Sequence, residues 1–191
     1  MKPTIIAKNK SHLINLIQQE IKLNGEKCDL NHIDVSKIND FSEVFKQSRF
    51  DGNISEWNTS NAENMHEMFL ESNFNGDISR WNIVSLKDME GMFADSRFDG
   101  DISGWDVSKV ESMDYLFADS LSFSKNLTNW KPYSLNEAND IFMNCDGLDI
   151  PYWAEYDDPN KRRLAIDNYW LKGELNKTLT NQDSSTKKLK L

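Results

Sequence analysis

Few residues of this 191-residue chain have the types and spacing that chemistry requires. His12, His32 and His66 lie in different segments and lack the spacing of metal ligands or of a catalytic triad. Cys28 lies close to His32, but loop positions account for this pair better than a nucleophile and its base. No glycine-rich phosphate loop is present. We therefore expect a protein that is not an enzyme, with no catalytic residues, no cofactor and no metal.

Asparagine and aspartate recur in two sets that could form stacked calcium ligands. The sets are Asp51, Asn75 and Asp99, and Asn53, Asp77 and Asp101. Stacked carboxylates and turn carbonyls suit calcium. The same side chains also accept hydrogen bonds from their own turn backbone. Because the chain lacks a GGxGxD repeat, we expect turns here and no bound ion.

Both sets belong to a repeat with a period of 24 residues. The stretch Phe74-Asn75-Gly76-Asp77-Ile78-Ser79-Arg80-Trp81 has close copies at 50–57 and 98–105. A degenerate copy precedes these three and a drifted copy follows them. Ile, Trp, Met and Phe recur at fixed places in the copies, which predicts that their side chains form the core.

The spacing within one copy predicts its local structure. Apolar residues at 62, 65, 68 and 69 lie on one face of a short helix, and Ser60 with Glu63 matches a capping box. The preceding Asp-Ile-Ser-x-Trp segment indicates a brief strand. The sequence therefore predicts an α/β repeat solenoid of short strand plus short helix, with about five repeats and a helical cap at each end.

Four regions are expected along the chain. Residues 1–27 form an N-terminal capping helix region, with Ser11 as the cap and Gly25 at the end. Residues 28–147 form the repeats. Residues 148–173 contain an aromatic segment and a second capping helix that starts at Asp158-Pro159. Residues 174–191 are expected to be a flexible tail.

The repeat resembles the BspA-like leucine-rich repeats of bacterial and mycoplasmal surface proteins. The closest stretch is Phe98-Asp99-Gly100-Asp101-Ile102-Ser103-Gly104-Trp105-Asp106-Val107-Ser108, and the resemblance covers about residues 28–145. The resemblance implies a curved, right-handed solenoid that binds other molecules, and it implies no catalytic residues. The N-terminus has no signal-peptide pattern, so a short stand-alone cytoplasmic member is expected.

The charge is divided unevenly along the chain. Residues 26–158 contain 27 acidic and 10 basic residues, and the chain as a whole carries −9. The strongly negative charge of residues 26–158 repels phosphates, which argues against direct nucleic-acid binding. No apolar run has the length of a membrane span, so no membrane contact is expected.

Residues that differ between copies, or share an unexplained charge, are the candidate protein-binding positions. They are Glu56, Arg80, Asp106, Glu67, Tyr115, Glu71, Asp95 and Asp119. The first hypothesis is a non-enzymatic module that binds a protein partner through an acidic face. Basic proteins and nucleic-acid-binding proteins are the partners considered. The alternative is an acidic phage or mobile-element inhibitor that blocks the basic nucleic-acid channel of a host defence enzyme. The sequence leaves the oligomeric state open.

Overall fold

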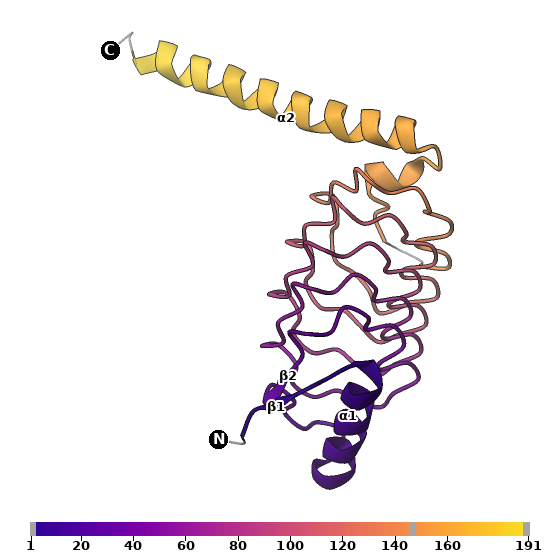
Figure 1. The fold of residues 1–191 in the computed structure, drawn as a ribbon. Helices are drawn as coiled ribbons and strands as arrows, with labels where there is room; N and C mark the ends of the chain where they lie inside the picture. Colours follow the sequence, from indigo (N-terminus) through magenta and orange to yellow (C-terminus); the bar gives the residue numbers. More distant parts are fainter. Residues whose placement is uncertain (1–2, 146–147, 189–191) are drawn as a thin grey trace.

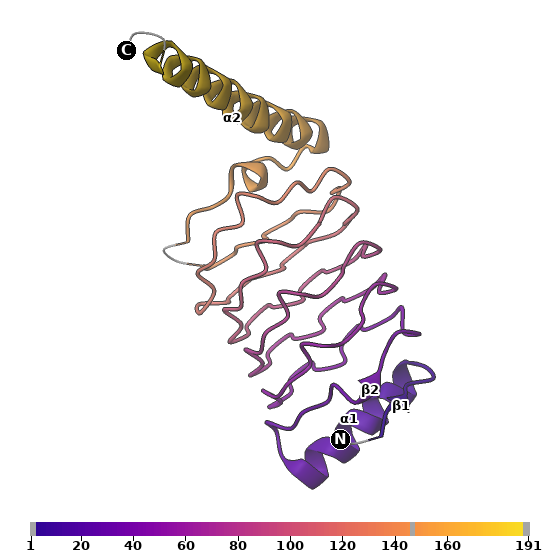
Figure 2. The ribbon, with the colours of Figure 1, turned by 90° about the vertical axis from the view of Figure 1, so that its left-hand side faces the viewer.

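The chain forms a column of stacked turns between two helices (Figure 1). This computed structural model describes residues 3–145 and 148–188. In chain order its elements are β1 (Ile5–Ile6), α1 (Lys10–Asn24), β2 (Ile33–Asp34), the 3-10 helix η1 (Tyr152–Glu155) and α2 (Pro159–Lys188). β1 and β2 pair in parallel, with Ile5 opposite Ile33. Figure 2 shows η1 between the last turns and α2.

The predicted α/β solenoid of strand-plus-helix repeats is wrong. The only α-helices of the described residues are α1 and α2, and the only sheet has two short strands. Between β2 and η1 the described chain forms turns and isolated parallel bridges. Ser60 does not cap a helix; its N–H instead donates to the Asn58 side chain at 3.2 Å.

Backbone conformation explains why the short helices do not form. Glu67 and Glu71, inside the expected helix, have φ angles of 50° and 54°. These angles lie in the left-handed region, where a right-handed helix cannot continue. The backbone N–H groups of both residues donate to the next turn of the chain, to Glu90 O at 2.8 Å and to Ala94 O at 2.9 Å. Bonds between turns thus replace the bonds that a helix would make within itself.

The same pattern of bonds joins five segments in a row. We call these segments the ladder: residues 40–47, 64–71, 88–95, 112–119 and 137–144. Isolated parallel bridges connect consecutive segments, for example Asn64 with Asp88 and Asp88 with Ser112. The ladder fixes which residues of neighbouring turns lie side by side.

The predicted Met, Phe and Trp columns are buried, which confirms their assignment to the core. Rings of neighbouring turns stack, as Phe69 and Phe93 do with centroids 5.7 Å apart and planes at 4°. Each buried tryptophan also donates its indole N–H to a carbonyl of an earlier turn. These pairs are Trp57 with Leu30, Trp81 with Ile54, Trp105 with Ile78, Trp130 with Ile102, and Trp153 with Leu127. Each of these indole N–H groups therefore has a hydrogen-bond acceptor within the apolar core.

The glycine that recurs in the three close copies makes room for this core. A Cβ atom on Gly76 would lie 2.7 Å from the Phe74 ring and 3.0 Å from Gly52 O. Such contacts are too short for any side chain. The glycine is therefore required mainly by the close approach of the phenylalanine ring two residues earlier.

Helix α1 begins two residues earlier than the sequence indicates, at Lys10. Asn9, and not Ser11, is its N-cap and accepts the His12 N–H at 2.9 Å. The helix ends at Asn24, and Gly25 follows with a φ of 84°. Leu13 and Ile17 of α1 are buried in the core next to the first turns.

Helix α2 begins at Pro159, with Asp158 accepting the Lys161 N–H at 2.9 Å, as expected for an N-cap. The helix continues past Gly173, where the sequence placed its end, to Lys188. One glycine with open space around it costs a helix only about 1 kcal/mol. Residues 189–191 of the expected tail lie outside the described residues, and the division into four regions stays a prediction. In the described part of the chain, neither helix combines the length and apolarity needed to cross a membrane.

Candidate functional site

Five of the predicted binding residues lie together on the ladder. They are Glu67, Tyr115, Glu71, Asp95 and Asp119, in two columns, and their φ angles lie between 48° and 59°. Turn residues on the surface keep their side chains accessible, and all but the half-buried Glu67 are exposed. The ladder thus brings these five side chains to one surface, although not on a helix as expected.

The other three predicted residues lie outside the ladder. Glu56, Arg80 and Asp106 are exposed, each near a tryptophan of the core. The Asp106 carboxylate accepts the Ser108 N–H at 3.0 Å, and the hydrogen bonds from Ser108 lower the pKa of Asp106 below its usual value. Asp106 therefore has a local role in its turn. A binding role for these three residues stays a prediction.

One ladder column consists of acids with an amide at each end. Gln47 donates its side-chain N–H to Glu71 at 3.0 Å, and Asn144 donates to Asp119 at 2.7 Å. Asp95 lies between them. Like charges in register repel one another. The amides relieve this repulsion at the two ends of the column, but three carboxylates remain in the middle.

Among the described residues, lysine side chains form ion pairs only with the first two segments of the ladder. Lys10 pairs with Asp40 at 3.4 Å, Lys46 pairs with Glu67, and His66 lies 3.8 Å from both Glu67 and Glu90. The last three segments carry Asp88, Glu90, Asp95, Asp114, Asp119, Glu137 and Asp140. Among the described residues no lysine or arginine forms an ion pair with any of these seven acids. Most of the ladder's acidic side chains that lack a lysine or arginine partner therefore lie in its last three segments.

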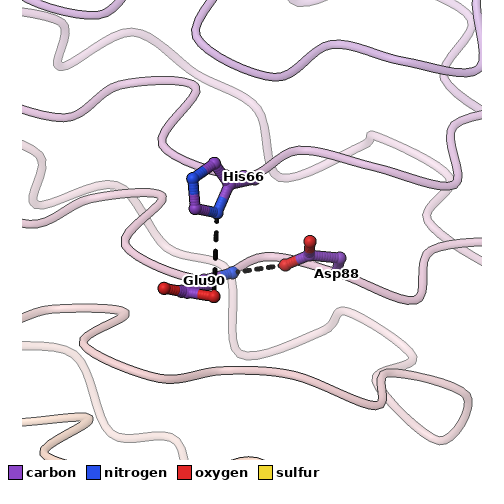
Figure 3. A group of neighbouring side chains, drawn as sticks. All are labelled: His66, Asp88 and Glu90. Atoms are coloured by element: carbon purple, nitrogen blue, oxygen red, sulfur yellow. Dashed lines mark hydrogen bonds and ion pairs between the residues drawn. The ribbon is translucent and has the colours of Figure 1, made fainter.

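His66, Asp88 and Glu90 form the one group of three potential metal ligands found among the described residues (Figure 3). One ligand atom from each residue lies within 4.8 Å of the other two, and all three side chains are half-buried. His66 Nδ1 lies 3.8 Å from the Glu90 carboxylate. Burial is the main cause that raises the pKa of Glu90. His66 opposes this shift, and the charges of Asp88, Asp114 and Glu137 add smaller increases.

The spacing between each histidine and its near neighbours in the sequence does not reveal this group. His66 and Glu90 are 24 residues apart and occupy equivalent places in consecutive copies. Asp88 precedes Glu90 by two residues, in the column of Asn64. The repeat period itself was the signal that could have placed these three side chains together.

The asparagine and aspartate sets considered for calcium bond to backbone, in two different ways. Asp77 and Asp101 accept the N–H two residues later in their own turns, at 2.9 and 3.0 Å, as expected. In the other set the acceptor bonds reach the next turn: Asp51 accepts the Asn75 N–H at 3.0 Å, and Asn75 accepts the Asp99 N–H at 2.8 Å. Both sets therefore have a structural role in shaping and joining turns.

Comparison with known proteins identifies the family of this chain. No curated protein and no solved structure matches the chain. One family model matches twice in tandem, at residues 13–97 and at residues 94–161. These matches extend from α1 through the ladder to the start of α2. Because they cover well over half of its length, the chain belongs to the family described as Mycoplasma protein of unknown function, DUF285.

Proposed function

We propose that this protein is a non-enzymatic binding module whose acidic ladder receives a basic protein partner. The observation that carries the proposal is the uncompensated charge of the last three ladder segments, where no described lysine or arginine pairs with the acids. A row of carboxylates in register costs folding free energy unless solvent screens it or a partner neutralises it. A surface of lysine and arginine would provide that neutralisation.

Two further points support a binding role. The ladder residues Glu71, Asp95 and Asp119 are exposed, so a partner can reach all three without a rearrangement of the turns. The FxGDISxW repeat resembles the BspA-like repeats, which implies binding and not catalysis. We therefore propose that the chain is a BspA-like binding protein within its family.

The test neutralises the acidic column without changing its shape. In the triple variant Glu71→Gln, Asp95→Asn and Asp119→Asn, the column carries amides throughout, as Gln47 and Asn144 do at its ends. A fluorescein-labelled poly-L-lysine peptide is the probe, and its anisotropy is measured over a range of salt concentrations. Exposed ion pairs contribute about 0.2–1 kcal/mol each, so losing three should weaken binding by roughly 10-fold.

The matched control removes the same charge elsewhere on the chain. Asp29, Asp77 and Asp101 are exposed members of one turn column in which Asn53 already stands, so Asn substitutions preserve the turn hydrogen bonds. This variant should bind the probe within about 3-fold of the unchanged protein. Equal weakening by both triple variants would show attraction to net charge alone, and it would reject the ladder as the binding surface.

A further inference from the structure

The second feature of the ladder is the group His66, Asp88 and Glu90, in which hydrogen bonds restrain the backbone of both His66 and Glu90. The Asn64 side chain accepts the His66 N–H at 2.8 Å, and the Asp88 side chain accepts the Glu90 N–H at 2.9 Å. A ladder bond from Glu67 N–H to Glu90 O at 2.8 Å joins the two segments. These hydrogen bonds restrain the backbone that carries the three ligand side chains, and the ligand atoms lie within 4.8 Å of one another. Small side-chain rotations bring them to the spacing that one bound ion requires.

The histidine is oriented as a metal ligand would be. Its Nδ1 faces Glu90, while its Nε2 faces the carboxylate of Glu67, each at 3.8 Å. Glu67 is in turn paired with Lys46. A carboxylate beside one ring nitrogen holds the proton there and leaves the other nitrogen free to bind a metal. The site thus has the outer carboxylate that commonly supports a ligating histidine.

The surroundings also favour a cation. Besides its own Asp88 and Glu90, the site is faced by Asp114 and Glu137, whose charges act on Glu90. Ser112, the bridge partner of Asp88 on the following segment, is only 6% exposed, and its hydroxyl oxygen makes no hydrogen bond within the part of the chain that the structure describes. Bridge partners in a parallel pair project from the same face. A water carried by a bound ion would give this buried hydroxyl the hydrogen bond it lacks.

We propose that His66, Asp88 and Glu90 bind one divalent transition-metal ion, with Zn²⁺ the expected ion. An imidazole nitrogen together with two carboxylates suits Zn²⁺, whereas Ca²⁺ and Mg²⁺ favour all-oxygen sites. Three protein ligands leave a coordination position open to water. The site shares Asp88 and Glu90 with the acidic ladder of the proposed function, but its test needs no basic partner and changes none of Glu71, Asp95 and Asp119 except as a control.

Isothermal titration of the full chain, purified without a histidine tag, tests the site with Zn²⁺ alone. Zn²⁺ should bind at one ion per chain, and Co²⁺ in its place should give the visible absorption of a low-coordinate site. His66→Asn and Asp88→Asn should each weaken Zn²⁺ binding by about 100-fold or more, since even outer residues contribute 10- to 100-fold. Asn occurs naturally in both columns, at Asn139 and Asn64, so both variants should keep the fold.

Two controls separate a defined site from general attraction to acids. Asp95→Asn removes one carboxylate of the same ladder outside the group and should leave Zn²⁺ affinity within about 3-fold. Glu67→Gln should weaken Zn²⁺ binding by about 10-fold while keeping one ion per chain. Equal binding of Mg²⁺ and Zn²⁺, or a Zn²⁺ affinity that His66→Asn leaves unchanged, would overturn the proposal.

Discussion

At the scale of single residues, the indole hydrogen bond of each buried tryptophan links one turn to an earlier one. Trp81 is 4% exposed, and its Nε1 donates to Ile54 O at 3.1 Å. Its ring also stacks on Trp57, with centroids 6.3 Å apart. The residue therefore provides both apolar burial and a hydrogen-bond donor for a buried carbonyl.

Substitution of Trp81 separates these two contributions. Trp81→Phe keeps an aromatic ring but removes the indole bond, while the Ile54 carbonyl still accepts the Trp57 N–H at 3.2 Å. The free energy of unfolding should therefore fall by about 0.5–1.5 kcal/mol. Trp81→Ala also creates a cavity and should cost about 3–5 kcal/mol. Urea unfolding followed by circular dichroism measures both. If Trp81→Phe is as stable as the unchanged protein, the indole bond contributes nothing.

The identity of the core was predictable from single residues, but the site was not. The Met and Phe columns are apolar in every copy, and burial of apolar side chains follows directly from that pattern. His66 and Glu90 carry no such pattern, because their proximity depends on how neighbouring turns align. Sequence distance hides this contact, whereas the backbone bond between Glu67 and Glu90 creates it.

At the scale of the element, each ladder segment is shaped by residues in the left-handed conformation. Glu71 has a φ of 54°, and Asp95 and Asp119 repeat this conformation in the same column. Asparagine and aspartate tolerate this region better than other side chains, and β-branched residues tolerate it least. The segment accepts this strain because the N–H of Glu71 gains a bond to the next turn.

The strain predicts opposite effects of two substitutions at Glu71. Glu71→Asn should leave stability unchanged or raise it by about 0.5–1 kcal/mol, as Asn144 occupies the same column. Glu71→Val should lower stability by about 1–2 kcal/mol. Thermal unfolding by calorimetry measures both changes.

Glu56 provides the control for this prediction. It is also exposed but is not among the residues with positive φ, so Glu56→Val should change stability by less than about 0.5 kcal/mol. Equal losses from Val at both positions would mean that the left-handed backbone is not the cause.

At the scale of the whole molecule, Arg162 fastens α2 to the end of the stacked turns. Its side chain is 1% exposed and donates to Leu135 O at 2.8 Å and to Tyr156 O at 2.7 Å. Burial lowers the pKa of Arg162 below its usual value, while Asp157 and Asp158 oppose the shift. Ile166 of the same helix is fully buried beside it.

Loss of Arg162 should therefore loosen α2 before it affects the turns. Arg162→Met keeps the apolar stem but removes the side-chain donor for the carbonyls of Leu135, Tyr156 and Asp157, which should reduce the local opening free energy of α2 by about 1–3 kcal/mol. Hydrogen exchange of the α2 amides measures this change, with amides at Phe69 and Phe93 as internal references. Lys161→Met, at an exposed position, should leave exchange unchanged. Equal acceleration in α2 and at Phe93 would instead mean that the entire chain opens together.

The sequence by itself determined the 24-residue register and the columns of side chains that face inward, such as Trp81 and Phe93. Apolar side chains leave water wherever the backbone permits, so their spacing predicts burial without knowledge of the backbone. Only the tertiary structure decided the form of that backbone. The spacing at 62, 65, 68 and 69 fits a helix, but bonds from Glu67 and Glu71 to the next turn replace helical bonds. Such bonds exist only when the neighbouring turn is present, and the same neighbour places Glu90 beside His66.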